Sequence, residues 1–217
     1  MIELDHVSKI YHPRGGSRNI VLNDASVVFP TGRNVGVLGL NGAGKSTLIR
    51  LISGTEMPDR GQVRRDRQVS FPLGLATIFH PDLSGRNNVY FLADIYGIDR
   101  YHLAEVVQDF SELGRQFDNQ TKTYSSGMLA KLAFGACLGI DFDIYLIDEI
   151  TEVGDGKFRE KALTAFAERT AYADIILVSH NVDTIRQFTN MGAVLHGGRI
   201  EMFDNVEAAI GRYRALV

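Results

Sequence analysis

Residues 39–47 have the sequence GLNGAGKST, which contains the pattern G-x-x-x-x-G-K-[ST]. Glycines let the backbone turn its N–H groups towards phosphate oxygens, and the N-terminus of a following helix adds partial positive charge. We expect Lys45 to reach the β- and γ-phosphates of a nucleoside triphosphate, Ser46 to ligate Mg²⁺ and Thr47 to lie near the α-phosphate. The loop residues predicted to contact the nucleotide are Gly39, Leu40, Asn41, Gly42, Ala43, Gly44, Lys45, Ser46 and Thr47.

This pattern alone indicates only a nucleoside-triphosphate site, which kinases, GTPases and motors share. A chance match in a glycine-rich chain is the alternative. The motif requires a strand before the loop and a helix after it. Residues 34–38 have an apolar strand pattern and residues 45–53 have a helical pattern, so the context favours phosphate binding.

Acids and a histidine end further apolar strand patterns. Residues 144–149, IYLIDE, end in Asp148, which can hold the Mg²⁺ shell, and Glu149, which can polarise the attacking water. Residues 175–180, IILVSH, end in His180, whose neutral imidazole can hydrogen-bond the γ-phosphate and that water. Solvated acids and a structural histidine are the alternatives. Beside a phosphate loop, we predict catalytic roles for Lys45, Glu149 and His180.

A second anion-binding helix end is indicated by YSSGM, residues 124–128, before the helical pattern LAKLAFGAC. Ser125 and Gly127 stand at the start of this helix, where hydroxyl and N–H groups suit an anion. A plain serine cap is the commoner explanation. Because the phosphate loop already serves this chain's own nucleotide, the functional alternative is that Ser125, Ser126 and Gly127 contact the nucleotide of another copy.

The elements that must position these residues follow an α/β pattern. Short apolar runs predict buried parallel strands, and helical patterns lie between them; the strand runs are residues 34–38, 144–147, 175–178 and 193–195. Helical patterns over about 87–115 and 125–139 have no strand pattern between them. We predict one domain over 1–217. Its nucleotide-binding core consists of 1–75 and 140–217, and a helical subdomain of 76–139 is inserted into it. A terminal helix is predicted from Asn205.

Composition excludes several classes of protein. The 217 residues carry a net charge of −3, which gives no basic field for nucleic acid. Cys137 is the only cysteine, so no intrachain disulfide is possible; it lies in an apolar run and is predicted to be a core residue. No signal-peptide pattern and no apolar stretch of about 18 to 20 residues is found, so we expect another chain to cross any membrane that this one serves.

The set GLNGAGKST, YSSGM, IYLIDE, VGD and VSH, in this order, resembles the nucleotide-binding subunit of ABC transporters over essentially the whole chain. The resemblance implies a P-loop NTPase (RecA-like) core with an inserted helical subdomain, the ABC ATPase fold. It implies ATP and Mg²⁺ as cofactors and a head-to-tail homodimer that sandwiches ATP. It also implies that Tyr11 stacks on adenine and that Asp155 crosses the dimer interface, although Tyr11 could equally be an ordinary aromatic residue at a strand end.

Longer stretches, from SFPLGLATIFHPDLSG to YLIDEITEVGD, resemble the short ATPases of capsular-polysaccharide exporters. This implies an ATPase motor at the cytoplasmic face of the bacterial inner membrane, held there by a pair of permease subunits that contact residues 80–95. Periplasmic export proteins are further partners of such systems, and no nucleic-acid partner is expected. Because the chain stops at Val217, without the added carbohydrate-binding domain of many O-antigen exporters, we favour capsule export over O-antigen or teichoic-acid export.

The chain departs from the family pattern at three positions. His80 stands where the family has a glutamine that touches Mg²⁺ and the attacking water, so a metal contact by His80 is in doubt. Asn87 stands in place of a common glutamate, and Met128 in place of the signature glutamine. Since Lys45 and the catalytic acids are retained, we predict an active enzyme rather than a DNA- or ribosome-directed ATPase or a non-enzymatic nucleotide switch.

Overall fold

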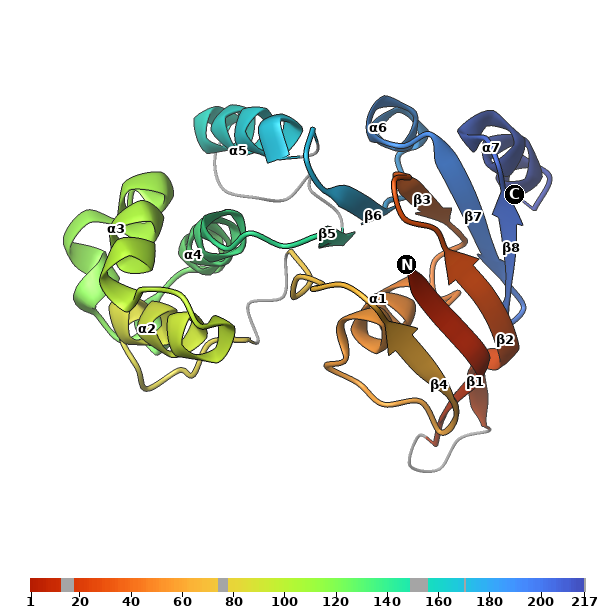
Figure 1. Cartoon of the computed structure of the whole chain (residues 1–217), viewed down its shortest axis with the longest axis horizontal. Coiled ribbons are helices and arrows are strands. Elements are labelled where there is room, and N and C mark those ends of the chain that lie inside the picture. Colours follow the sequence, from red (N-terminus) through yellow and green to blue (C-terminus); the bar gives the residue numbers. More distant parts are fainter. Residues whose placement is uncertain (13–17, 74–77, 149–155, 170, 217) are drawn as a thin grey trace. The chain divides into compact units, whose positions relative to one another are not determined.

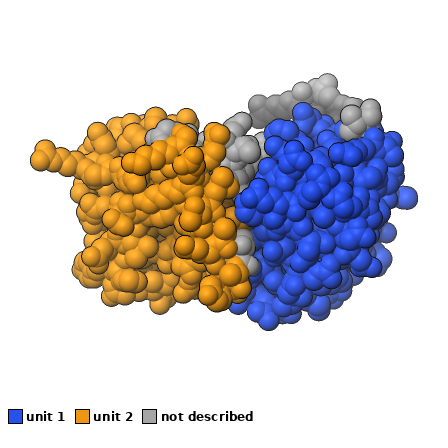
Figure 2. Space-filling view, turned by 90° about the horizontal axis from the view of Figure 1, so that it is seen from above, with its two compact units in different colours: residues 1–72, 143–149, 173–217 blue, residues 73–142, 150–172 orange. Residues whose placement is uncertain are grey.

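The computed structural model describes residues 1–12, 18–73, 78–148, 156–169 and 171–216. The chain forms two compact units, coloured separately in Figure 2. Unit 1 contains residues 1–72, 143–149 and 173–217, and unit 2 contains residues 73–142 and 150–172. Unit 1 is therefore built from three separate segments of the chain.

The main sheet of unit 1 has the strand order β5-β6-β3-β7-β8 (Figure 1). Its strands are β3 (Val35–Leu38), β5 (Ile144–Asp148), β6 (Asp174–Val178), β7 (Met191–His196) and β8 (Arg199–Phe203). The first four are parallel, and β8 is antiparallel to β7. The apolar runs that predicted buried parallel strands are confirmed, because β3 is buried throughout and β5 up to its last residue.

A second, antiparallel sheet has the order β2-β1-β4. Its strands are β1 (Ile2–Tyr11), β2 (Asn19–Phe29) and β4 (Arg60–Arg65). Tyr11 is the last residue of β1, so it lies at a strand end. The core of unit 1 is formed by β1, β2, β3, β5, β6, β7 and helix α1 (Lys45–Ser53); it includes Leu4, Leu22, Val37, Leu48 and Leu146.

Helices α6 (Val182–Phe188) and α7 (Val206–Arg214) cover the opposite face of the main sheet from α1 (Figure 1). Gly36 of β3 and Gly192 of β7 are direct partners in the sheet. A Cβ atom on Gly36 would lie 2.7 Å from Ile185 of α6, and one on Gly192 would lie 2.2 Å from Ala209 of α7. Glycine at both positions therefore allows the helices to pack directly on the sheet. The predicted terminal helix is confirmed as α7.

Unit 2 is helical. It contains α2 (Gly85–Tyr96), α3 (Arg100–Ser111), the 3-10 helices η2 (Gly114–Asp118) and η3 (Thr121–Thr123), α4 (Ser126–Gly139) and α5 (Gly156–Arg169). The helical pattern predicted over about 87–115 is interrupted, because Gly97 ends α2 with φ of 70° and Asp99 caps α3. Cys137 is fully buried in α4, as expected.

Helix α5 groups with unit 2, whereas the sequence prediction placed all of 140–217 in the core. The physical reason is an aromatic cluster. The Phe158 ring of α5 lies 5.6 Å from that of Phe110 in α3 and 6.5 Å from that of Phe134 in α4, both edge-on. Buried Phe158 thus places α5 against the helical unit. In the part of the chain that the structure describes, no helix is long and apolar enough to cross a bilayer.

Candidate nucleotide-binding site

The predicted phosphate loop connects β3 to α1 in unit 1. Gly42 and Gly44 adopt positive φ angles of 79° and 104°, which strongly favour glycine. Gly39 has a different reason to be glycine, because a Cβ there would lie 2.6 Å from the carbonyl oxygen of Leu195 in β7. A hydrogen bond of 3.0 Å from the Ala43 N–H to the Leu40 carbonyl closes the turn. The glycines of the motif therefore set the shape of the loop.

Lys45 lies inside this loop. Its Nζ donates hydrogen bonds to the carbonyl oxygens of Gly39 at 2.7 Å and Leu40 at 3.1 Å, and its side chain is buried. The loop therefore curls around an ammonium group. Ser46, the next residue, is exposed, and Thr47 is buried.

The N-terminus of α1 suits a phosphate group. Gly44 is its N-cap and provides no side-chain hydrogen bond, whereas side-chain oxygens cap α2, α3, α4, α6 and α7. The first N–H groups of a helix have no partner within the helix, so a bound anion can accept them. With the Lys45 ammonium and the Ser46 hydroxyl beside them, the residues present fit the triphosphate of a nucleotide.

The sheet register brings the other predicted residues of unit 1 to the same edge. Val178, at the end of β6, pairs with Asp148 of β5 on one side and with Val37 of β3 on the other. Three predicted parts of the site therefore lie at the carboxyl ends of three adjacent strands: Asp148 as the last residue of β5, the phosphate loop after β3, and the segment with His180 after β6. Ligands bind at this end of parallel sheets. Asp148 is partly buried and His180 is exposed.

A divalent ion at this edge would have few ligands from the protein itself. Among the residues that the structure describes, no group of three or more His, Cys, Asp or Glu side chains could hold a metal on its own. Mg²⁺ in nucleotide sites is commonly held by one or two protein oxygens together with phosphates and water. The Ser46 hydroxyl and the Asp148 carboxylate fit that role. Glu149 and Asp155, predicted to polarise water and to cross a dimer interface, lie outside the described residues.

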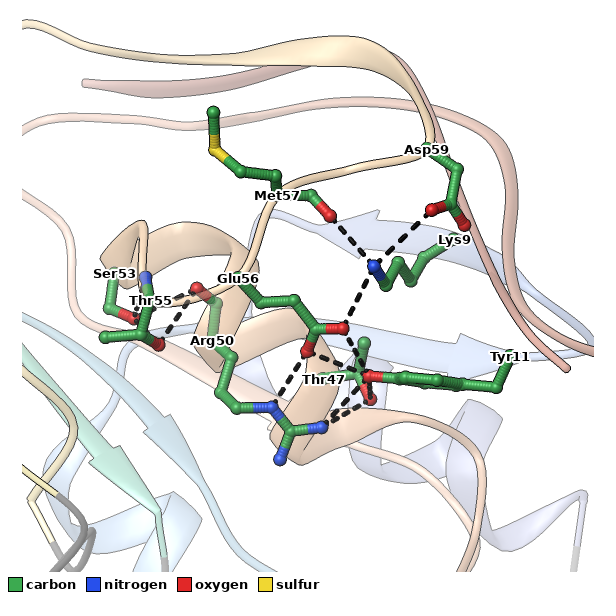
Figure 3. Close-up of polar contacts among 9 residues, drawn as sticks. All are labelled: Lys9, Tyr11, Thr47, Arg50, Ser53, Thr55, Glu56, Met57 and Asp59. Atoms are coloured by element: carbon green, nitrogen blue, oxygen red, sulfur yellow. Dashed lines mark hydrogen bonds and ion pairs between the residues drawn. The ribbon is translucent and has the colours of Figure 1, made fainter. Parts of the chain in front are cut away.

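Tyr11, at the end of β1, takes part in a polar network with α1 and the segment after it (Figure 3). Its hydroxyl donates to the Glu56 carboxylate at 2.7 and 2.8 Å, and Arg50 donates to the same hydroxyl at 3.2 Å. Arg50 also donates to Thr47 Oγ1 at 3.1 Å. Glu56 and Arg50 belong to no motif and were not predicted from the sequence. Thr47 and Arg50 are three residues apart on a helix, and this spacing predicts their contact. No such spacing predicts the contacts of Glu56 with Tyr11 or Arg50.

His80 belongs to unit 2, and its main chain is fixed there. Its N–H donates to Asn88 Oδ1 at 2.7 Å, and its carbonyl accepts from Asn88 Nδ2 at 3.1 Å and from Thr121 Oγ1 at 2.9 Å. The imidazole is exposed, and its Nδ1 accepts a hydrogen bond from the Asp82 N–H at 3.3 Å. The geometry therefore gives His80 a well-anchored backbone within unit 2, and its predicted contact with a metal remains a prediction.

Ser125, Ser126 and Gly127 form the N-terminus of α4 in unit 2. Ser125 is exposed and caps the helix, because its Oγ accepts a hydrogen bond of 3.2 Å from the Met128 N–H. A Cβ on Gly127 would meet only Ser125 Oγ, at 3.9 Å, so the surface around it is open. The second half of α4 is buried, and this end is not. The serine cap and an outward-facing anion site are both compatible with this geometry.

The chain is similar to known proteins over its whole length. The family model described as "ABC transporter" matches residues 22–152, which is more than half of the chain. The capsule polysaccharide export ATP-binding protein CtrD of Neisseria meningitidis serogroup B is 42% identical over 100% of both chains. A polysialic acid transport ATP-binding protein, KpsT of Escherichia coli, is 41% identical over 99% of both chains.

A solved structure of the ATP-binding cassette MJ0796, dimeric and bound to ADP and Pi, covers 95% of this chain and 99% of its own. Its TM-score is 0.78 at 22% identity, so it supports the fold. The chain belongs to the ABC transporter family, as an ATP-binding subunit with the α/β ABC ATPase fold. Within that family it groups with CtrD and KpsT, the proteins of capsule and polysialic acid export. The predicted family and fold are thus confirmed.

Proposed function

We propose that this chain is the ATP-hydrolysing motor that drives export of a capsular polysaccharide across the bacterial inner membrane. The observation that carries this proposal is full-length similarity to CtrD and KpsT, at 42% and 41% identity, in a chain with an intact phosphate loop around Lys45. Export of O-antigen or teichoic acid is not favoured, because both relatives are named for capsule or polysialic acid.

The proposed roles within unit 1 follow from the geometry of the sheet edge. The N-terminus of α1 and Lys45 bind the β- and γ-phosphates, and Thr47 lies near the α-phosphate. Ser46 and Asp148 ligate Mg²⁺, which when bound neutralises charge on the transferred phosphoryl group. Glu149 orients and polarises the attacking water, and His180 hydrogen-bonds the γ-phosphate. Tyr11 provides the aromatic surface for adenine.

We further propose that two copies form a head-to-tail dimer, in which Ser125, Ser126 and Gly127 of one copy face the nucleotide held by Lys45 of the other. The support is the exposed N-terminus of α4, which carries N–H groups and hydroxyls that one copy's own phosphate loop does not need. Asp155 then lies at the dimer interface. A pair of permease subunits contacts residues 80–95 and holds the ATPase at the cytoplasmic face of the membrane, and periplasmic export proteins complete the pathway.

The test is phosphate release by the chain purified with its membrane subunit, in the presence of candidate lipid-linked glycans. We expect wild type to hydrolyse ATP and a capsular glycan to stimulate it. Glu149→Gln should retain ATP binding and lose about 100-fold or more in hydrolysis, since a positioned general base contributes about that much. Lys45→Ala should lose binding as well.

Glu160→Gln is the matched control, because it makes the same change on the exposed surface of α5 and should leave hydrolysis unchanged. If the wild-type complex never turns over ATP, the motor function is wrong and a nucleotide-dependent switch explains the site better. If a different polymer stimulates hydrolysis and capsular glycans do not, the substrate assignment is wrong while the ATPase assignment stands.

A further inference from the structure

Glu56 lies at the centre of the polar network shown in Figure 3, although it is not part of any nucleotide-binding motif. It follows α1 by three residues, and its side chain is only 19% exposed. One carboxylate oxygen accepts from Tyr11 at 2.7 Å and from Lys9 at 3.0 Å, and the other accepts from Tyr11 at 2.8 Å and from Arg50 at 2.9 Å. Both oxygens are therefore engaged by donors from two elements, β1 and α1.

The network joins the aromatic residue to the phosphate-binding helix. Arg50 NH2 donates to the Tyr11 hydroxyl at 3.2 Å and to Thr47 Oγ1 at 3.1 Å. The Tyr11 hydroxyl lies 3.4 Å from Thr47 Oγ1 itself. Thr47 is in the first turn of α1, beside the predicted phosphate site. Glu56 thus sets the distance between the end of β1 and the start of α1.

Lys9 restricts the ring from one side. Its Nζ lies over the Tyr11 ring, 5.5 Å from the centroid, and its side chain is only 12% exposed. This ammonium also donates to the Met57 carbonyl at 2.9 Å and lies 3.5 Å from Asp59. A cation on one face of the ring leaves the other face for a base, and hydrogen bonds hold the hydroxyl end in place.

The charges balance within the network. Lys9 and Arg50 are the cations, and Glu56 and Asp59 are the anions. Burial alone would raise the pKa of Glu56, but the hydrogen bonds from Tyr11, Arg50 and Lys9 outweigh it and lower this pKa to about 2. The carboxylate is therefore ionised at any physiological pH, and it is a permanent acceptor for the tyrosine hydroxyl.

From this geometry we infer that Glu56 is a positioning residue for the nucleotide base: it holds the Tyr11 ring at a fixed place relative to the phosphate loop. The inference rests on the proposed adenine contact of Tyr11. Glu56 touches neither base nor phosphate in this arrangement. Replacing Glu56 should therefore weaken the binding only of ligands that carry a base. Replacing Lys45 should weaken the binding of any ligand that carries the phosphates.

The experiment measures dissociation constants by calorimetry for ATP and for inorganic tripolyphosphate, which has no base. Glu56→Gln should weaken ATP binding about tenfold, the size expected for losing one charge-assisted hydrogen bond, and leave tripolyphosphate binding within about twofold. In hydrolysis the KM for ATP should rise and kcat should stay near wild type. Tyr11→Phe keeps the ring but loses the hydroxyl, and it should show the same selective loss.

Glu3→Gln is the matched control, because it makes the same change in another ion pair of unit 1, with Arg64 at 3.0 Å and outside this network, and it should leave ATP binding near wild type. The double variant Tyr11→Phe with Glu56→Gln should bind ATP no more weakly than either single variant, since both act through one hydroxyl. Unchanged ATP binding by Glu56→Gln, or an equal loss of tripolyphosphate, overturns the positioning role. If wild type binds ATP no more tightly than tripolyphosphate, the proposed contact between Tyr11 and adenine is wrong.

Discussion

The hydroxyl of Ser70 accepts a hydrogen bond of 2.8 Å from the backbone N–H of Leu146, in the middle of β5. Ser70 is fully buried, and its own N–H donates to the Ile144 carbonyl at 2.9 Å. The segment around Ser70 therefore extends the main sheet beyond β5 by side-chain and backbone bonds. Because β5 ends in Asp148, this contact helps to hold the proposed metal ligand in place.

Ser70→Ala should lower the free energy of unfolding by about 1 to 3 kcal/mol, because it leaves the Leu146 N–H buried without its acceptor. Urea unfolding followed by circular dichroism measures this loss. Ser111→Ala is the control, since Ser111 is equally buried but its hydroxyl only donates, to Gln108 at 3.5 Å. Equal losses of stability in both variants would show that the hydrogen bond to Leu146 adds nothing measurable to the free energy of unfolding.

Gly39→Ala should damage the phosphate loop. Its Cβ would lie 2.6 Å from a backbone oxygen of β7, so the loop or the strand must shift, at a cost of about 1 to 3 kcal/mol. We expect ATP binding to weaken together with stability. Gly211→Ala in α7 introduces the same methyl group into open space and should be neutral or stabilising by up to about 1 kcal/mol. Wild-type ATP affinity in Gly39→Ala would mean that the loop tolerates the displacement.

The ionised state of Glu56 should contribute to stability in a defined pH range. Its pKa is lowered from 4.5 in the unfolded chain to about 2, despite the opposing effect of burial, by bonds from Tyr11, Arg50 and Lys9. The contribution, on the order of 3 kcal/mol, is present above about pH 4.5 and is lost as the pH falls to about 2. Unfolding of wild type and Glu56→Gln in urea, from pH 7 to pH 2, should show curves that converge at low pH.

Glu112→Gln provides the comparison for this pH dependence. Glu112 also pairs with a lysine, Lys161, at 2.9 Å, but its side chain is 48% exposed, so solvent screens the pair and its removal should have little effect on stability at any pH. A difference between wild type and Glu56→Gln that stays constant from pH 7 to pH 2 would contradict an ionised Glu56 in the network.

Ser125→Arg should act on the partner's nucleotide if the proposed dimer is correct. In a mixed dimer with Lys45→Ala on one copy and Ser125→Arg on the other, one composite site stays intact, and we expect about half of wild-type ATP hydrolysis. With both changes on the same copy, neither site is intact, and hydrolysis should be lost. Equal activity of the two mixed dimers would exclude a shared site.

Ser84→Arg controls for the loss of a helix cap in this experiment. Ser84 caps α2 as Ser125 caps α4, by accepting from the N–H three residues on, at 3.1 Å. Either arginine should cost about 1 kcal/mol of stability through the lost cap. Ser84→Arg should leave hydrolysis by the isolated dimer near wild type.

The sequence predicted the parts of the fold that local pattern determines. Apolar runs located the parallel strands, and the helical period located α1 with the bounds that the structure shows. The pairing of β1 with β2 and β4 was not predicted, because register between distant segments has no local signature. For the same reason the pattern could not show that Phe158 attaches α5 to unit 2.

For the candidate site, motifs located Lys45 and Asp148, and the sheet register explains how they meet at one edge. Glu56 gave no such signal, since an acid in a turn after a helix is usually solvated. Its role depends on Lys9, Tyr11 and Arg50 arriving from two elements. Ser70 was missed in the same way, because its partner Leu146 is distant in the sequence. Supporting contacts of this kind join residues that are distant in the sequence, so no local pattern indicates them.

The strand order has a consequence for the synthesis of the chain. β3 carries the phosphate loop, yet its two neighbours in the sheet, β6 and β7, are made much later, from Asp174 and Met191 onwards. During translation the apolar residues of β3 therefore have no strand partners until the whole of unit 2, up to α5, has been synthesised. A nascent chain of this order should depend on chaperones during that interval, and the ability to bind nucleotide should arise only when the last fifth of the protein has emerged.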